Sequence, residues 1–205
     1  ITNIVMLIEG VGCVVTRSSA DAQGIDAYSR WSGGRPIIML TNDKQDAARS
    51  NFDAAHELGH LVMHPDAEPG SRTVEHQAQA FASAFLMPAS SIRSELPRRF
   101  EVGAYVELKR RWRVSIQALL YRARTLEVIS EPAFRRAMSR ISLWGWRTGE
   151  PHSLGAADEP TLLRSALELL DSSEAGLGFL REAGIPDDIL TMLLPMKRPS
   201  HALVQ

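Results

Sequence analysis

The sequence of 205 residues has little that would suit a disulfide-stabilised, membrane-spanning or strongly nucleic-acid-binding protein. Its only cysteine, Cys13, cannot form a disulfide within the chain, which is typical of proteins in a reducing compartment. No apolar run approaches the length of a membrane span, and no signal peptide opens the chain. A formal net charge of −1 gives no overall electrostatic reason to expect nucleic-acid binding. These absences together predict a cytoplasmic globular protein.

The strongest chemical signal is an H-E-x-x-H pattern that runs from His56 to His60. Residues four positions apart on a helix lie one above the other, so these two imidazoles would point to the same spot. Two neutral imidazoles at that separation can share one tetrahedral Zn²⁺. Glu57 would then stand beside the metal as a general base.

The surrounding sequence predicts a helix over residues 44–64, which Pro65 would end. Asn42 and Asp43 offer side-chain oxygens that could cap its first turn. Gly59 inside this helix costs roughly 1 kcal/mol relative to alanine, so we expect another backbone to approach closely there. One face of the predicted helix is apolar, with Phe52, Ala55, Leu58, Gly59 and Val62 at helical spacing.

A catalytic zinc site needs a third protein ligand besides the two histidines. His64 continues the four-residue series but would lie about 12 Å along the axis from His56, so we expect it to interact with the helix dipole instead. Glu75 is the better candidate, because a second predicted helix over residues 72–87 places it on a stripe that faces the core. A carboxylate there is costly unless it is paired or bound to a metal. The alternative is an acid that stabilises the first turn of its own helix.

Three stretches of the sequence combine into one pattern, F-D-A-A-H-E-L-G-H at 52–60, E-H-Q-A-Q-A-F-A at 75–82 and F-L-M-P at 85–88. This pattern resembles the ImmA/IrrE family of zinc peptidases, whose members carry an A-H-E-L-G-H helix, an E-x-x-A-x-x-F-A helix and an L-M-P ending. The resemblance covers residues 1–145. Asp53 departs from it, because the family more often has a small hydroxyl residue there. Asp53 could accept a hydrogen bond from an imidazole N–H or could be solvated.

The resemblance implies a zinc metallopeptidase that acts on a protein. The family's ligand roles fall on His56, His60 and Glu75, and Glu57 would take up the proton of the attacking water and deliver it to the leaving amine. The implied substrate is a helix-turn-helix repressor, whose cleavage would switch on a stress response or a mobile-element programme. Members of this family are often fused to an N-terminal XRE-like helix-turn-helix domain. An oxyanion donor is expected as well, and the candidates are Tyr28, Tyr105 and His76.

The order of the predicted elements indicates an α+β fold. Three short strands come before the two motif helices and predict a small, mostly antiparallel sheet packed on the HExxH helix, followed by a helical C-terminal region. The edge strand of such a sheet commonly borders a peptidase cleft, where it can pair with an extended substrate. The strands are expected at residues 12–17, 25–31 and 36–41, while residues 3–9 fit a short helix or a strand.

Three regions are expected along the chain. They are a zinc metallopeptidase-like domain over residues 1–100, a helical module over 101–145, and a linker with C-terminal helices over 146–205. The linker is predicted at 145–160, because glycine, proline and small polar residues are frequent there. The expected helices of the last two regions are 105–111, 115–126, 131–144, 162–170 and 176–194.

The helices at 105–111 and 115–126 have the spacing of a helix-turn-helix, with Ser115 as a plausible N-cap. Lysines and arginines make this pair locally basic, but Gln117 is the only obvious base-reading side chain near the start of the second helix. We therefore favour a structural pair that is solvated or contacts a partner, and we do not expect DNA binding by this chain.

A hypothesis from a different class is a transcription-regulatory sensor or interaction protein with a peptidase-like fold and little or no proteolytic activity. In that case the zinc site would be structural or silent. The intact Glu57 argues against this hypothesis, because a purely structural site has no use for a base.

Overall fold

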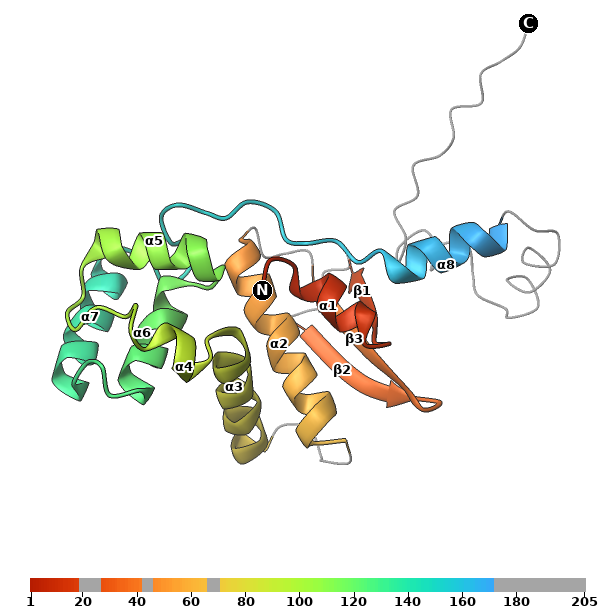
Figure 1. Ribbon diagram of the computed structural model, residues 1–205, viewed down its shortest axis with the longest axis horizontal. Helices are drawn as coiled ribbons and strands as arrows, with labels where there is room; N and C mark the ends of the chain where they lie inside the picture. The colour runs from red at the N-terminus through yellow and green to blue at the C-terminus, as the bar shows by residue number, and fades with distance from the viewer. Residues whose placement is uncertain (19–26, 42–45, 66–70, 172–205) are drawn as a thin grey trace, which may run out of the picture.

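The computed structural model has an α+β architecture, as the sequence predicted (Figure 1). It describes residues 1–18, 27–41, 46–65 and 71–171, so the predicted helix at 176–194 lies outside the described residues. Within these ranges the chain forms eight helices and one three-stranded sheet. No helix in these ranges is long and apolar enough to cross a lipid bilayer.

The sheet has the strand order β1-β3-β2, with β1 at Val14–Ser18, β2 at Ala27–Ser32 and β3 at Arg35–Thr41. β2 and β3 form an antiparallel hairpin whose two-residue turn, Gly33-Gly34, has positive φ at both positions. β1 pairs with β3 in parallel, so the sheet is mixed. The parallel pair arises because β2 reverses the chain direction and β3, the third strand in sequence, lies in the middle.

The N-terminal run, for which the sequence left helix and strand open, is the helix α1 at Ile4–Gly10. The Asn3 side chain caps it by accepting a 2.8 Å hydrogen bond from the Met6 N–H. Its inward side, which includes Ile4 and Ile8, is buried in the core. α1 and the sheet together cover one side of the helix that carries the H-E-x-x-H motif (Figure 1).

That helix is α2, at Ala47–Met63, and it lies between the sheet and α3, at Arg72–Leu86 (Figure 1). The observed cap of α2 is Asp46, whose side chain accepts a 2.9 Å hydrogen bond from the Ala48 N–H. The helix therefore starts later than the predicted residue 44, and Asn42 and Asp43 lie outside the described residues. The close approach expected at Gly59 is confirmed, because an added Cβ would lie 3.0 Å from Cδ1 of Phe81 on α3.

The helical module begins after the short helix α4 at Ala89–Ile92. It contains α5 at Val102–Trp112, α6 at Ile116–Thr125 and α7 at Glu131–Leu143. The turn between α5 and α6 uses Arg113 in the left-handed conformation, with φ of 54°. Ser115 caps α6 as predicted, accepting a 3.0 Å hydrogen bond from the Ala118 N–H.

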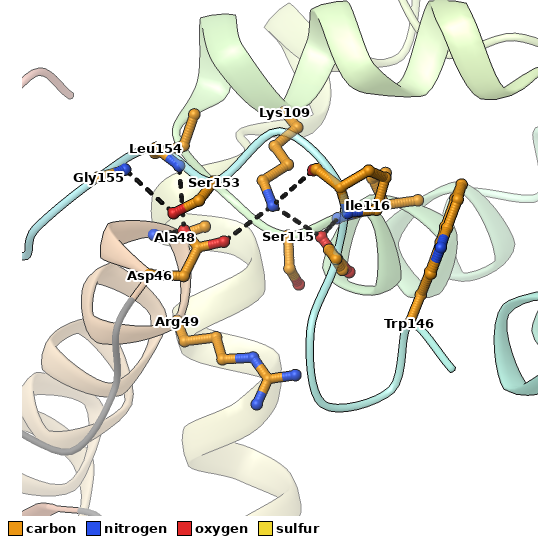
Figure 2. Close-up of polar contacts among 12 residues, drawn as sticks. Asp46, Ala48, Arg49, Lys109, Ser115, Ile116, Trp146, Ser153, Leu154 and Gly155 are labelled. Atoms are coloured by element: carbon orange, nitrogen blue, oxygen red, sulfur yellow. Dashed lines mark hydrogen bonds and ion pairs between the residues drawn. The ribbon is translucent and has the colours of Figure 1, made fainter. Parts of the chain in front are cut away.

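Residues 145–161, which we call the strap, join α7 to α8 at Leu162–Asp171. The sequence predicted a linker here, and the strap has no helix or strand, yet it is anchored along its length. Lys109 of α5 is fully buried and donates hydrogen bonds to Asp46 at 2.9 Å and to Glu150 of the strap at 3.2 Å (Figure 2). The Ala47 N–H donates a 3.0 Å bond to the Gly155 carbonyl. The strap therefore ties the start of α2 to the helical module.

Candidate metal centre

Three side chains of the kinds that bind metal ions converge from two helices. Nε2 of His56 lies 3.0 Å from Nε2 of His60 and 3.2 Å from Oε2 of Glu75. Nε2 of His60 lies 3.7 Å from Oε1 of Glu75. One donor atom from each of the three residues lies within 4.8 Å of the others, so together they could hold one metal ion. These are the three residues that the sequence predicted would meet.

The two histidines owe their positions to the helical spacing of α2, and Glu75 owes its position to the contact between α2 and α3. Gly59 lets the two helices approach closely, since its Cα faces Ala78 and Phe81 without an intervening side chain. Glu75 lies in the first turn of α3, and its side chain is 48% exposed. Its stripe does face the core at Ala78, but Glu75 itself lies at the exposed edge of that stripe.

The electrostatic setting of His56 favours its neutral form. Burial lowers the pKa of this imidazole, and the neighbouring His60 lowers it further, while Glu57 and Glu75 act in the opposite direction. A neutral imidazole keeps a lone pair available, which is the form that binds a metal ion.

Glu57 lies beside the centre, but its side chain is directed toward the sheet. The residue is only 7% exposed, and its Oε2 accepts a 2.6 Å hydrogen bond from the Ser29 hydroxyl of β2. Two residues further along β2, Nε1 of Trp31 donates a 3.1 Å hydrogen bond to the Leu61 carbonyl of α2. Alternation along a strand places Ser29 and Trp31 on the same face. The face of β2 that packs on α2 therefore also holds the carboxylate of Glu57.

Sequence reasoning did not identify Ser29, because a serine in a short polar strand carries no motif. The signal that could have found it is the two-residue spacing to Trp31, which marks one face of the strand. Within the described strands β2 has a neighbour on one side only, so it is an edge strand, and its Ser29 contacts Glu57 beside the metal centre. This agrees with the expectation that an edge strand lies beside the site.

The other residues considered from the sequence, as a metal ligand or as oxyanion donors, lie in different surroundings. His64 is the C-cap residue of α2, and its Nε2 lies 2.7 Å from Oε1 of Gln77 rather than in the metal cluster. Tyr105 is fully buried, and burial raises its pKa to about 12, so it cannot reach a substrate and is wrong as an oxyanion donor. Tyr28 on β2 and His76 on α3 are both exposed. Tyr28 alternates with Ser29 and so lies on the face of β2 opposite to the one that packs on α2, which leaves His76 as the candidate nearer the centre.

Comparison with known families agrees with this geometry. Residues 8–124, more than half of the chain, match the IrrE N-terminal-like domain, a peptidase family designated M78. A search of curated proteins finds no match. The matched range contains both helices of the metal centre and all three strands. A metallopeptidase-like function follows from this match at the level of the family, and the chain belongs to the IrrE N-terminal-like family of M78 peptidases.

Proposed function

We propose that this chain is a zinc-dependent endopeptidase in which His56, His60 and Glu75 hold the metal and Glu57 is the general base. The observation that carries the proposal is the convergence of three donor atoms beside the buried carboxylate of Glu57, which lies on the same helix as the two histidines. Two imidazoles and one carboxylate form a donor set typical of catalytic zinc. Donor atoms about 2.0–2.1 Å from a tetrahedral ion lie about 3.3 Å apart. The separations of 3.0, 3.2 and 3.7 Å lie around that value.

A bound zinc ion would act as a Lewis acid that polarises the scissile carbonyl and makes water acidic enough to attack near neutral pH. The protein's own contribution to the proton transfer is Glu57. Its carboxylate takes the proton of the attacking water and passes it to the leaving amine. Ser29 holds Oε2 of this carboxylate, which leaves Oε1 for the water. The position of the base is thereby fixed by β2 rather than by α2 alone.

The edge of β2 gives the chain a way to hold an extended polypeptide. A substrate strand that pairs with this edge would run along α2, with its backbone amides bonded to β2. Trp31 and Tyr28 are exposed on the same strand and would contact its side chains. The resemblance to the ImmA/IrrE family suggests that the substrate is a helix-turn-helix repressor.

The test of this function is a cleavage assay with a helix-turn-helix repressor as the substrate. The zinc-loaded chain should yield a discrete cleavage product. A chelator should abolish that product, and an excess of zinc should restore it. A wild-type chain that binds zinc but leaves this repressor and unrelated polypeptides intact would instead favour the transcription-regulatory sensor with a silent peptidase fold.

We also propose that the α5–α6 pair supports the peptidase and does not read DNA. The backbone N–H groups of Ile116 and Gln117, at the start of α6, donate to the Glu150 carboxylate at 2.8 and 3.0 Å. The Gln117 side chain donates a 3.2 Å bond to the Trp146 carbonyl. A recognition helix reads bases with the residues near its start, and here that end is covered by an acidic strap.

DNA binding by this pair can be measured by titrating the chain against a panel of duplexes at about 150 mM salt, where specific binders typically reach roughly 10⁻⁸ M. We expect only weak binding that fades as the salt concentration rises. Sequence-selective binding in that range, weakened by Gln117→Ala, would contradict the structural role.

A further inference from the structure

A concave region lies next to the metal centre. It is a cavity of about 640 Å³ between α2, α3 and α6, and Arg147 of the strap also lines it. On α2, Arg49 and Asp53 line it, and they continue the same helical stripe that carries His56 and His60. On α3 it begins at His76, the residue directly after Glu75. The cavity and the metal centre therefore share two helices and lie side by side along α2.

The charge of this cavity is mostly positive. Four arginines line it, and Asp53 is the only acidic residue in its lining. Arg124 has an ion pair with Glu131, at 3.6 Å. Arg49 and Arg147 hydrogen-bond neutral oxygens of the protein, which leaves their charge uncompensated by those contacts. The lining therefore favours an anionic group.

Arg122 lines the cavity and has hydrogen-bonding capacity to spare. Only 8% of it is exposed, and its Nε donates a 2.9 Å hydrogen bond to the Met87 carbonyl. Its terminal nitrogens form no hydrogen bond or ion pair with any of the described residues. These nitrogens are not fully buried and are open to the solvent of the cavity, where the guanidinium keeps its charge and can offer N–H donors to a ligand. A carboxylate entering the cavity would satisfy this group with the fork geometry that arginine prefers.

We propose that the cavity is a specificity subsite that accepts an acidic side chain, Asp or Glu, of the protein substrate. This inference rests on the proposed peptidase function. Asp53 and Arg49 precede His56 by three and seven residues, which places the α2 wall about 5–10 Å from the metal centre at 1.5 Å per residue. An extended peptide advances about 3.3 Å per residue. The acidic residue should therefore lie two or three positions from the cleaved bond, on the side that faces the start of α2.

The preference of the enzyme around the cleaved bond can be measured with a peptide library made from a digested proteome. The cleavage sites are identified by mass spectrometry. The zinc-loaded wild type should cleave with about tenfold enrichment of Asp and Glu at one of those two positions. Arg122→Gln should lose this enrichment, and Arg136→Gln, a variant of an exposed arginine on α7, should retain it.

A second pair of variants keeps the test independent of the buried position of Arg122. Ala80 lines the cavity and is exposed on α3, so its replacement does not disturb the core. Ala80→Glu would place a carboxylate in the cavity and should remove the acidic preference, while Ala80→Gln, which has nearly the same volume, should keep it.

The outcomes separate the two claims. Cleavage of the library without an acidic preference, or a preference that survives both Arg122→Gln and Ala80→Glu, overturns the subsite and leaves the peptidase intact. A wild type that binds zinc and cleaves no peptide overturns the peptidase function, and the subsite with it.

Discussion

The Ser29 hydroxyl donates a 2.6 Å hydrogen bond to Oε2 of Glu57 and so joins the edge strand of the sheet to the helix that carries both histidines of the candidate metal centre. The residues are 28 positions apart in sequence and belong to different elements. In the proposed mechanism this bond holds the base in one orientation. The strand that would align the substrate is therefore also the strand that aligns the base, which links substrate binding to catalysis.

Removal of this bond should reduce the rate of the chemical step. Ser29→Ala should lower kcat about 10-fold or more, because a hydrogen bond to a charged group is worth roughly 1.5–3 kcal/mol. KM and zinc content should change little, since the Ser29 hydroxyl bonds to Glu57 and not to a metal ligand, and the substitution leaves the backbone of β2 unchanged. Ser29→Thr keeps the hydroxyl and should retain most of the activity. Equal kcat values for Ser29→Ala and the wild type would contradict the positioning role.

The ligand set can be tested by metal analysis of purified variants. Wild-type protein should bind about one zinc ion per chain, and Glu75→Ala should weaken this binding strongly, because it removes one of three ligands. His76→Ala and His64→Ala are matched controls, since each removes a histidine near the centre that lies outside the cluster. Loss of zinc in His76→Ala together with full zinc in Glu75→Ala would show that the ligand assignment is wrong.

The close contact at Gly59 should make any larger residue at this position destabilising. Gly59→Ala places a Cβ 3.0 Å from the Phe81 side chain and 3.3 Å from the Ala78 backbone, so the Phe81 ring or the two helices must shift by a few tenths of an ångström. We expect a loss of about 1–3 kcal/mol in the free energy of unfolding and weaker zinc binding, measured by urea denaturation and metal titration. Gly103→Ala is the control, because nothing lies within 4 Å of its added Cβ. It should be neutral, or stabilise α5 by about 0.5–1 kcal/mol.

The buried ion cluster around Lys109 should contribute strongly to stability. Lys109→Met removes the cation and leaves the carboxylates of Asp46 and the nearly buried Glu150 without their cationic partner. Breaking a buried pair in this way costs about 3–5 kcal/mol, which should appear as a lower midpoint of urea denaturation. Arg110→Met, at an exposed pair with Glu107 on the same helix, should change stability by about 0.5 kcal/mol or less. A small effect of Lys109→Met would mean that the strap is held by other contacts.

Much of the local structure could be predicted from sequence, because helical spacing and N-caps act over a few residues. The convergence of His56 and His60 follows from their four-residue spacing, and the N-cap at Ser115 follows from its own turn. The contacts that cross the fold could not be predicted. Ser29 reaches Glu57 only because β2 packs on α2, and β1 becomes parallel to β3 only because β3 takes the central place.

The strap is a second example of contacts that the local sequence does not predict. A segment rich in glycine and proline predicts a connection without regular structure, and this is what residues 145–161 form. Nothing in the local sequence indicates that Glu150 meets Lys109, which is 41 residues earlier. Arg122 is a similar case, because its burial and its place in the cavity depend on the packing of α6 near α3.

The role of Glu57 as the catalytic base is tested most directly by comparing Glu57→Gln with the wild type in one cleavage assay. The zinc content is measured on the same samples. Glutamine has nearly the same volume and helix propensity as glutamate but cannot take up the proton. We expect a folded variant with about one zinc ion per chain and no detectable cleavage of the repressor that the wild type cuts. Cleavage at the wild-type rate by the zinc-loaded variant would contradict the central claim that Glu57 is the catalytic base.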